Sequence, residues 1–215
     1  MSRLIAVIGE SGSGKTTSFR SLNPEETYYI DADGKGLCWR GWREQYNTER
    51  KNYYRTRSAQ DISNILVGIS QKRPNIHNII IDTLNTVMVQ HEISEMKNGG
   101  YGKWVELTQF VWELLTTAGQ LREDINVIVT FHSETLRDEE GGYTFTRIRT
   151  NGRKLEKVQL ETLFSTVLLA EITDDGRHVF KTHADHSTAK TPFGAFDADE
   201  IDNDMAAVLA VLSEF

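Results

Sequence analysis

The sequence predicts a doubly wound α/β fold with a mostly parallel sheet, and three observations predict it. Short apolar stretches rich in β-branched residues, typical of buried strands, alternate with longer amphipathic stretches typical of helices. Several of the apolar stretches end on a polar residue, as strands do where a parallel sheet binds its ligand. The 215 residues are 39% hydrophobic, and with only three prolines and no low-complexity run no linker is evident. We therefore expect one α/β domain over residues 1–215, with helices on both faces of the sheet.

Boundaries follow from the hydrophobic period and from residues that start or stop helices. Ser58 with Asp61 three residues later is typical of a helix start, and Pro74 stops the helix that follows. A turn signal at 140–142 between two alternating segments predicts a β-hairpin excursion over 133–154. The expected strands are 3–8, 27–31, 53–56, 77–82, 125–131, 166–172 and 177–182, and the expected helices are 16–22, 58–73, 83–97, 103–123, 155–163 and 204–215; residues 37–50 carry no clear pattern.

The stretch GESGSGKT, directly after the first expected strand, meets every fixed position of the phosphate-binding pattern G-x-x-x-x-G-K-[ST]. Its glycines allow the backbone to approach an anion closely, and its amides at a helix start attract negative charge. Lys15 can reach the β- and γ-phosphates of a nucleotide, and the hydroxyl of Thr16 can ligate Mg²⁺. We therefore expect a P-loop that binds ATP and Mg²⁺. Its candidate binding residues are Gly9, Glu10, Ser11, Gly12, Ser13, Gly14, Lys15, Thr16 and Thr17.

Asp82 ends the clearest of the expected strands, HNIIID. A carboxylate in this position typically lies near the Mg²⁺ of a P-loop, so we expect Asp82 and Thr16 to ligate the metal together. The alternative is an Asp that only caps the following helix. The next residue is Thr83, whereas ATPases of the AAA type usually carry a water-activating Glu there. The catalytic base must then lie elsewhere in this chain.

Two stretches resemble the RecA-type recombinases. The run YYIDADGKG is similar to their second strand, and this resemblance implies that Asp33 is the general base and Asp31 a supporting carboxylate. Asp replaces the usual Glu, so the reach is one methylene shorter. The run VTFHSE lies where the RecA core has a polar sensor of the γ-phosphate, which implies that role for His132. Without the resemblance, Asp33 is a turn residue and His132 a structural histidine.

A third stretch, AKTPFG, is similar to the K-N-R-F-G run of RadA-like ATPases, although Pro192 replaces the Arg. The resemblance implies that Lys190 reaches the phosphates of a neighbouring subunit, and hence a homo-oligomer, either a ring or a filament. With Lys15, Asp33 and His132, Lys190 completes the candidate catalytic residues. Over nearly its full length the chain resembles the small phage-encoded ATPases with a minimal RecA core that act in single-strand annealing or recombination. We therefore expect a DNA-stimulated ATPase.

In the RecA core, two loops after the metal-binding and sensor strands face single-stranded DNA. The matching stretches here combine basic and aromatic residues, which suits contact with a nucleic-acid backbone and with bases. The alternative is an ordinary solvated hairpin, because acidic residues at 138–140 dilute the positive charge. The candidate DNA-binding residues are Lys97, Tyr101, Lys103, Arg147, Arg149 and Arg153.

Net charge, cysteine content and the first apolar stretch limit the class of protein and its compartment. A net charge of −7 does not by itself indicate nucleic-acid binding, although a local basic face can lie on an acidic protein. Cys38 is the single cysteine, which excludes an internal disulfide and fits a reducing compartment. The first apolar stretch is too short for a signal peptide or a membrane span, so we expect a cytoplasmic protein, in the host cell if phage-encoded, with no membrane contact.

Two other functions remain open. A P-loop kinase of a small molecule would use a lid with phosphate-clamping arginines, for which Arg147, Arg149 and Arg153 are available. A nucleotide-dependent module could instead regulate a partner without appreciable turnover. The histidines at 178, 183 and 186 have a spacing that fits no standard zinc site.

Overall fold

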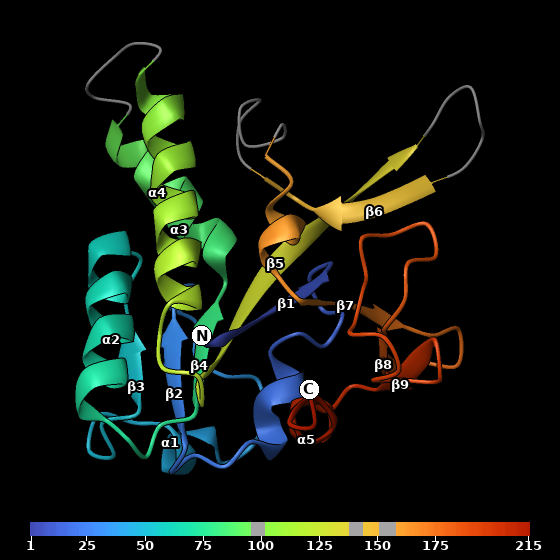
Figure 1. Ribbon diagram of the computed structural model, residues 1–215, viewed down its shortest axis with the longest axis horizontal. Coiled ribbons are helices and arrows are strands. Elements are labelled where there is room, and N and C mark those ends of the chain that lie inside the picture. The colour runs from blue at the N-terminus through green and yellow to red at the C-terminus, as the bar shows by residue number, and fades with distance from the viewer. Residues whose placement is uncertain (96–101, 138–143, 151–157) are drawn as a thin grey trace.

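The structure is a computed structural model that describes residues 1–95, 102–137, 144–150 and 158–215 (Figure 1). Within these ranges the chain forms a nine-stranded sheet. Its strands are β1 (Arg3–Gly9), β2 (Thr27–Asp31), β3 (Tyr53–Arg55), β4 (Asn78–Asp82), β5 (Asn126–Arg137), β6 (Thr144–Ile148), β7 (Thr166–Ile172), β8 (His178–Lys181) and β9 (Glu200–Asp202).

Six neighbouring strands, in the order β3–β2–β4–β5–β1–β7, run parallel. Strands β8 and β9 extend the edge beside β7 in antiparallel pairs. Strand β6 pairs antiparallel with the last part of β5, and this hairpin projects from the body of the sheet in Figure 1. The predicted α/β fold with a mostly parallel sheet and a hairpin excursion is confirmed.

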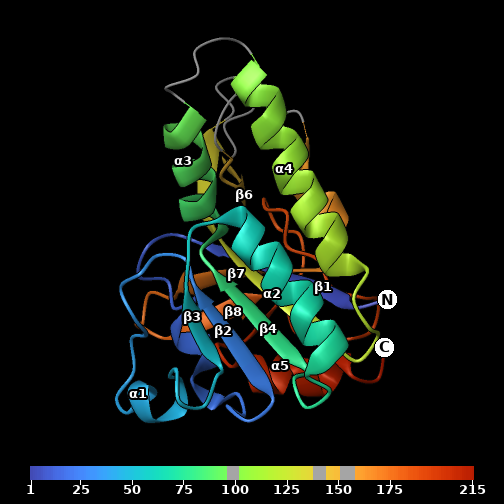
Figure 2. The same cartoon turned by 90° about the vertical axis from the view of Figure 1, so that its left-hand side faces the viewer.

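Helices cover both faces of the sheet. On one face lie α2 (Ala59–Lys72), α3 (Leu84–Glu95) and α4 (Gly102–Gly119); on the other lie the 3₁₀ helix η1 (Thr17–Ser21), α1 (Trp42–Gln45) and α5 (Met205–Leu212). Figure 2 looks onto the first face, where α2 and α4 lie in front of the strands. In β1, Ala6 and Ile8 pack toward α4, whereas Ile5 and Val7 pack toward η1 and α5. Because both faces are buried, the central strands are apolar throughout.

The element boundaries differ from the sequence predictions in places that have physical reasons. The helix predicted over 16–22 is the five-residue 3₁₀ helix η1, since Pro24 follows so closely that a longer helix has no room. Strand β5 continues past residue 132 to Arg137, because pairing with β6 extends it. Part of the unassigned segment forms α1, and β9 was not predicted. Of the helix predicted over 155–163, the described part is a 3₁₀ helix, η4 (Leu160–Leu163), and the hairpin turn at 140–142 lies outside the described residues.

The start of α2 matches its prediction in detail. Ser58 is the N-cap, and its hydroxyl accepts a hydrogen bond from the amide of Asp61 at 3.3 Å. The side chains of Ile62, Leu66 and Ile69 are buried against the sheet, as the helical period requires. Among the described residues, the structure contains no helix with the length and apolar character needed to cross a membrane.

Candidate active site

The loop after β1 presents backbone donors without acceptors. In the described part of the chain, the amides of Gly12, Gly14, Lys15 and Thr16 have no hydrogen-bond acceptor in the protein. Gly14 has a φ of 102°, and a Cβ at this position would lie 2.8 Å from Nδ1 of His178. Only glycine fits there without a shift of the His178 side chain. Unpaired amides on such a turn are the donors that a phosphate group requires.

The ammonium group of Lys15 lies against the same loop. It donates hydrogen bonds to the carbonyl oxygens of Gly9 and Glu10, both at 2.7 Å, and the residue is only 7% exposed. Burial lowers the pKa of Lys15 to about 8, against the opposing influence of the Asp82 carboxylate. A phosphate anion would be a stronger partner for this ammonium than the two neutral carbonyls are.

The carboxylate of Asp82 joins four elements of the structure. Its Oδ2 accepts hydrogen bonds from the Thr16 hydroxyl at 2.8 Å and the Tyr29 hydroxyl at 2.5 Å. Its Oδ1 accepts from Thr130 at 2.6 Å and from Thr83 at 3.1 Å. Burial and the Asp82 charge raise the pKa of Tyr29 well above its usual value, so this hydroxyl stays protonated and donates. Asp82 is therefore held rigidly beside the P-loop.

The donor set fits a nucleotide with Mg²⁺. Hydroxyl and carboxylate oxygens are the ligands that Mg²⁺ prefers, and Thr16 and Asp82 offer one of each, 2.8 Å apart. The loop adds the unpaired amides and the Lys15 ammonium for the phosphates. Thr16 and Asp82 would hold the metal, which when bound would neutralise charge on the phosphate oxygens.

Asp33 follows β2 and has both carboxylate oxygens engaged. Oδ1 accepts a hydrogen bond from the Thr86 hydroxyl at 2.5 Å, and Oδ2 lies 2.7 Å from Nζ of Lys35. Burial acts to raise the pKa of Asp33, but the hydrogen bonds from Lys35 and Thr86 and the Lys35 charge outweigh it, so this pKa lies below its usual value. The Asp33 side chain is therefore an ionised carboxylate at neutral pH.

Asp31, for which the RecA resemblance implies a supporting role, binds backbone amides of the turn after β2. Its two oxygens accept hydrogen bonds from the amides of Gly34 at 2.7 Å and Gly36 at 3.0 Å. The hydroxyl of Tyr53 also donates to it, at 2.5 Å. Asp31 is 3% exposed and does not line the cavity that contains Lys15 and Asp33. Its carboxylate shapes the turn that carries Asp33.

His132 is connected to the helix after β4 and to the hairpin. Its amide donates to Oδ1 of Asn85, and its carbonyl accepts from the amide of Arg149, both at 2.8 Å. Burial, followed by the charge of Lys15, lowers the pKa of His132, so the imidazole is neutral at neutral pH. In this form the ring can donate one hydrogen bond and accept another.

One cavity of about 290 Å³ collects these groups where the parallel strands end. Its wall includes the P-loop from Ser11 to Thr17 except Ser13, and Asp33, Asp82 and His132. The P-loop, Asp33, Asp82 and His132, which follow or end predicted strands, therefore lie together, as expected for a ligand site of an open parallel sheet. The structure brings Lys15, Thr16, Asp33, Asp82 and His132 into one site.

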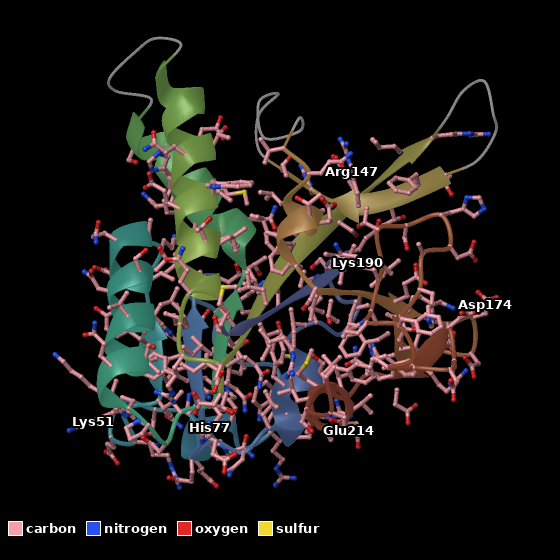
Figure 3. The ribbon with its side chains drawn as sticks, in the orientation of Figure 1. Lys51, His77, Arg147, Asp174, Lys190 and Glu214 are labelled. Atoms are coloured by element: carbon pink, nitrogen blue, oxygen red, sulfur yellow. The ribbon has the colours of Figure 1, made fainter. Side chains whose placement is uncertain are left out.

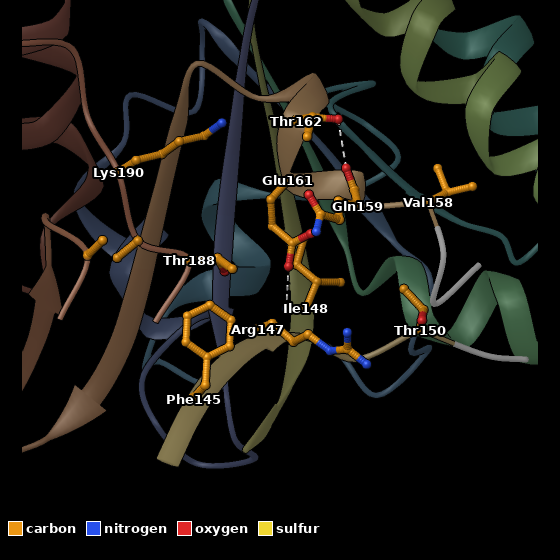
Figure 4. A pocket seen from close by; sticks show the side chains of 12 residues that line it. Phe145, Arg147, Ile148, Thr150, Val158, Gln159, Glu161, Thr162, Thr188 and Lys190 are labelled. Atoms are coloured by element: carbon orange, nitrogen blue, oxygen red, sulfur yellow. Dashed lines mark hydrogen bonds between the residues drawn. The ribbon is translucent and has the colours of Figure 1, made fainter. Parts of the chain in front are cut away.

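Lys190 and Arg147 lie elsewhere, in the wall of a separate, mainly apolar cavity of about 360 Å³ near the hairpin (Figures 3 and 4). The backbone of Lys190 pairs with Val167 on β7, through hydrogen bonds of 2.8 and 2.9 Å. Arg147 makes an ion pair with Glu134 at 2.7 Å across the hairpin. In Figure 4 the side chains of Lys190 and Arg147 extend in different directions from the cavity wall. Neither residue lines the nucleotide cavity of its own chain.

The remaining DNA-binding candidates are only partly described. Arg149 is exposed on the hairpin, at the end of β6. Lys97, Tyr101 and Arg153 lie outside the described residues, and Lys103 lies in the first turn of α4, where only the backbone is described.

Sequence reasoning missed several residues of the site. Tyr29 and Thr130 bind the Asp82 carboxylate from the strands on either side, yet in the sequence they are ordinary strand residues. Thr86, on α3, binds Asp33. Lys35 lines the cavity and pairs with Asp33. Its position in the glycine-rich turn after β2 is the one signal that the sequence offered.

Comparison with known proteins agrees with this geometry. A search for similar curated proteins found no match. A family model described as an AAA domain matches residues 1–193, a range that includes the P-loop, Asp33, Asp82, His132 and Lys190. The chain therefore belongs to this AAA domain family of P-loop NTPases.

Proposed function

We propose that this protein is a Mg²⁺-dependent ATPase with a RecA-like core that binds single-stranded DNA and promotes its annealing or recombination. The observation that carries the ATPase is the convergence of Lys15, Thr16, Asp82 and Asp33 on one cavity. The amides of the loop and the Lys15 ammonium would bind the phosphates. Asp33 would orient the attacking water, accept its proton and so assist hydrolysis.

Hydrolysis would transfer the γ-phosphoryl group of ATP to the attacking water. The water oxygen bonds to the γ-phosphorus while its proton passes to a carboxylate oxygen of Asp33. The bond from the γ-phosphorus to the bridging oxygen breaks, and the electron pair leaves on ADP. The neutral His132 ring lies in the cavity wall, where it could donate a hydrogen bond to a phosphate oxygen.

The support for a link between nucleotide and DNA is the course of β5. This strand lines the nucleotide cavity with His132 and then continues to Arg137 as the first strand of the hairpin. At the end of the second strand, Arg149 donates its amide to the His132 carbonyl and accepts at its own carbonyl from the Asn85 side chain, both at 2.8 Å. DNA on the hairpin would thus act on residues that contact the nucleotide site.

The experiment that tests this function is ATP hydrolysis measured with and without single-stranded DNA. We expect turnover to rise when single-stranded DNA is added and to respond less to the same mass of duplex. If the ATP turnover rate does not change when DNA is added, the protein is an ATPase and the proposed DNA partner is rejected. Absence of nucleotide binding would reject the ATPase as well.

We infer from Lys190 that the active form is a homo-oligomer. A charge beside the transferred phosphoryl group is worth about 10³–10⁵ in rate in related enzymes. Lys190 is not in the wall of its own nucleotide cavity, as expected for a residue that acts on a neighbouring subunit.

Mixing Lys190→Ala with Lys15→Ala tests this inference. Each variant alone should be inactive, and the mixture should recover activity, because some interfaces pair an intact P-loop with an intact Lys190. No recovery, together with turnover per subunit that does not depend on protein concentration, would contradict it.

A small-molecule kinase has less support. Such an enzyme needs arginines that clamp the phosphates, and among the described residues no arginine lines the nucleotide cavity. Arg147 is engaged with Glu134, and Arg149 lines a neighbouring cavity with His132 and Asn85.

A further inference from the structure

A second lysine lies in the nucleotide cavity, outside the P-loop pattern. Lys35 is in the cavity wall with Lys15, and its ammonium lies 2.7 Å from Oδ2 of Asp33. The side chain is 69% exposed, so it does not hold the core together. An ammonium this close to the candidate base occupies one of the two oxygens that the base would use.

The turn that carries Lys35 is built to hold it there. The Asp31 carboxylate binds the amides of Gly34 and Gly36, the residues on either side of Lys35. Both glycines have positive φ, 74° and 80°, which fixes the reversal of the chain. The backbone of Lys35 is thus held from both sides, while its long, exposed side chain can rotate between different anionic partners.

The charge of Lys35 acts on the groups that would surround a terminal phosphate. Burial is the largest cause of the lowered pKa of Lys15, and the Lys35 charge lowers it further. Lys35 also contributes, after burial and Lys15, to the lowered pKa of His132. The ammonium groups of Lys15 and Lys35 therefore face one cavity, beside the carboxylates of Asp33 and Asp82. A phosphate group between the two ammonium groups would relieve their mutual repulsion.

We propose that Lys35 is a phosphate-contacting residue of the ATPase, whose ammonium moves from Asp33 to the terminal phosphate of bound ATP and so frees Asp33 for the attacking water. This inference rests on the proposed function. Asp33 would thus lose its ion pair with Lys35 only when a γ-phosphate is bound. ADP, which lacks that phosphate, leaves the ion pair between Lys35 and Asp33 in place.

The proposal predicts a difference between nucleotides in binding as well as in rate. Replacement of Lys35 by Met removes a charge-assisted hydrogen bond to the γ-phosphate, so affinity for the slowly hydrolysed analogue ATPγS should fall about tenfold or more. Affinity for ADP should change by less than about twofold, because its phosphates bind the P-loop. Lys35→Arg keeps the charge and should retain most of the ATPγS affinity.

The experiment is calorimetric titration of ADP and ATPγS with Mg²⁺ into the wild type, Lys35→Met and Lys35→Arg. Lys72→Met is the matched control, since Lys72 is an exposed residue in the last turn of α2 and does not line the nucleotide cavity. Thermal unfolding of each protein checks folding, and Lys35→Gln replaces Lys35→Met if the latter unfolds. A selective loss of ATPγS binding in the neutral variant, rescued by Arg, supports the proposal. Equal changes for both nucleotides, or none, would overturn it.

A double-mutant cycle tests the exchange of partners directly. Asp33→Asn removes the negative charge that competes for the Lys35 ammonium, so ATPγS should bind more tightly than to the wild type. In the Lys35→Met background, Asp33→Asn should raise ATPγS affinity much less, because only the repulsion between the phosphate and the Asp33 charge is then removed. The same gain in both backgrounds would mean that Lys35 does not pass between Asp33 and the phosphate. If wild-type protein binds neither nucleotide, the proposed function fails; if it binds both and Lys35 has no selective effect, only this inference fails.

Discussion

The hydroxyl of Thr16 donates a hydrogen bond to the carboxylate of Asp82 across 2.8 Å, although 66 residues separate them in the chain. The contact connects the end of the P-loop to the end of β4 and brings together the two oxygen ligands expected for Mg²⁺. Asp82 is in turn fixed by Tyr29 and Thr130 from β2 and β5. The expected metal site therefore depends on the order of the strands as much as on the two motifs.

The hydrogen bonds to Asp82 predict a stability effect. In Asp82→Ala, the fully buried hydroxyls of Tyr29 and Thr130 lose their acceptor, so the free energy of unfolding should fall by about 2–4 kcal/mol. Tyr29→Phe, which removes a single hydroxyl and leaves Thr16 and Asp82 in place, should cost about 1 kcal/mol. Urea denaturation of both variants measures this. An Asp82→Ala protein as stable as the wild type would contradict the network.

Asp33 predicts a separation of binding from turnover. Asp33→Asn keeps the shape of the side chain but cannot accept a proton, so ATP should still bind while hydrolysis slows by about 10²–10⁴-fold. Asp174→Asn, in an exposed turn between β7 and β8, is the control and should turn over normally. Steady-state phosphate release compares them. Unchanged turnover in Asp33→Asn would mean that the base lies elsewhere.

The lowered pKa of Lys15 predicts a pH dependence of ATP binding. Below about pH 8 the side chain is an ammonium, and above it the free protein loses this charge. Bound phosphates favour the ammonium, so binding above pH 8 takes up a proton and affinity falls as pH rises, by at most about tenfold per pH unit. ATP affinity measured between about pH 7 and pH 9.5, with proton uptake from buffers of different ionisation enthalpy, tests this. A flat profile without proton uptake would contradict the expected role of Lys15.

The hairpin predicts a salt-dependent interaction with DNA. Replacing Arg147, Arg149 and Arg153 together by Gln should weaken single-stranded DNA binding and reduce the slope of log affinity against log salt by about 0.7 for each lost phosphate contact. Arg147→Gln alone should matter less than Arg149→Gln, because Glu134 already neutralises Arg147. Fluorescence anisotropy over a salt series measures both. Equal slopes for the wild type and the triple variant would move the DNA site off this hairpin.

The sequence predicted the parts of the site that are local in the chain. The P-loop pattern, the strand that ends at Asp82 and the strand that reaches His132 each follow from a few adjacent residues, and the structure brings them together. The helix start at Ser58 was equally local, because a cap needs only residues three positions apart.

The rest depended on contacts that adjacent residues do not specify. The resemblance to RecA-type recombinases separated Asp33 from Asp31, but the adjacent residues alone do not. The chain leaves the strand after Asp31, so the turn decides which carboxylate enters the cavity. Asp31 instead binds the turn amides of Gly34 and Gly36. The roles of Tyr29 and Thr130 require knowing that β2 and β5 flank β4, and that order is a property of the whole sheet.

The most direct test of the account is equilibrium binding of ATP with Mg²⁺ to the wild type and to Lys15→Ala. Lys15 provides charge at the cavity and donates only to two loop carbonyls, so its loss should leave the fold intact. We expect the wild type to bind ATP and the folded variant to bind it very weakly or not at all. ATP affinity unchanged in Lys15→Ala would contradict the assignment of this loop as the nucleotide site.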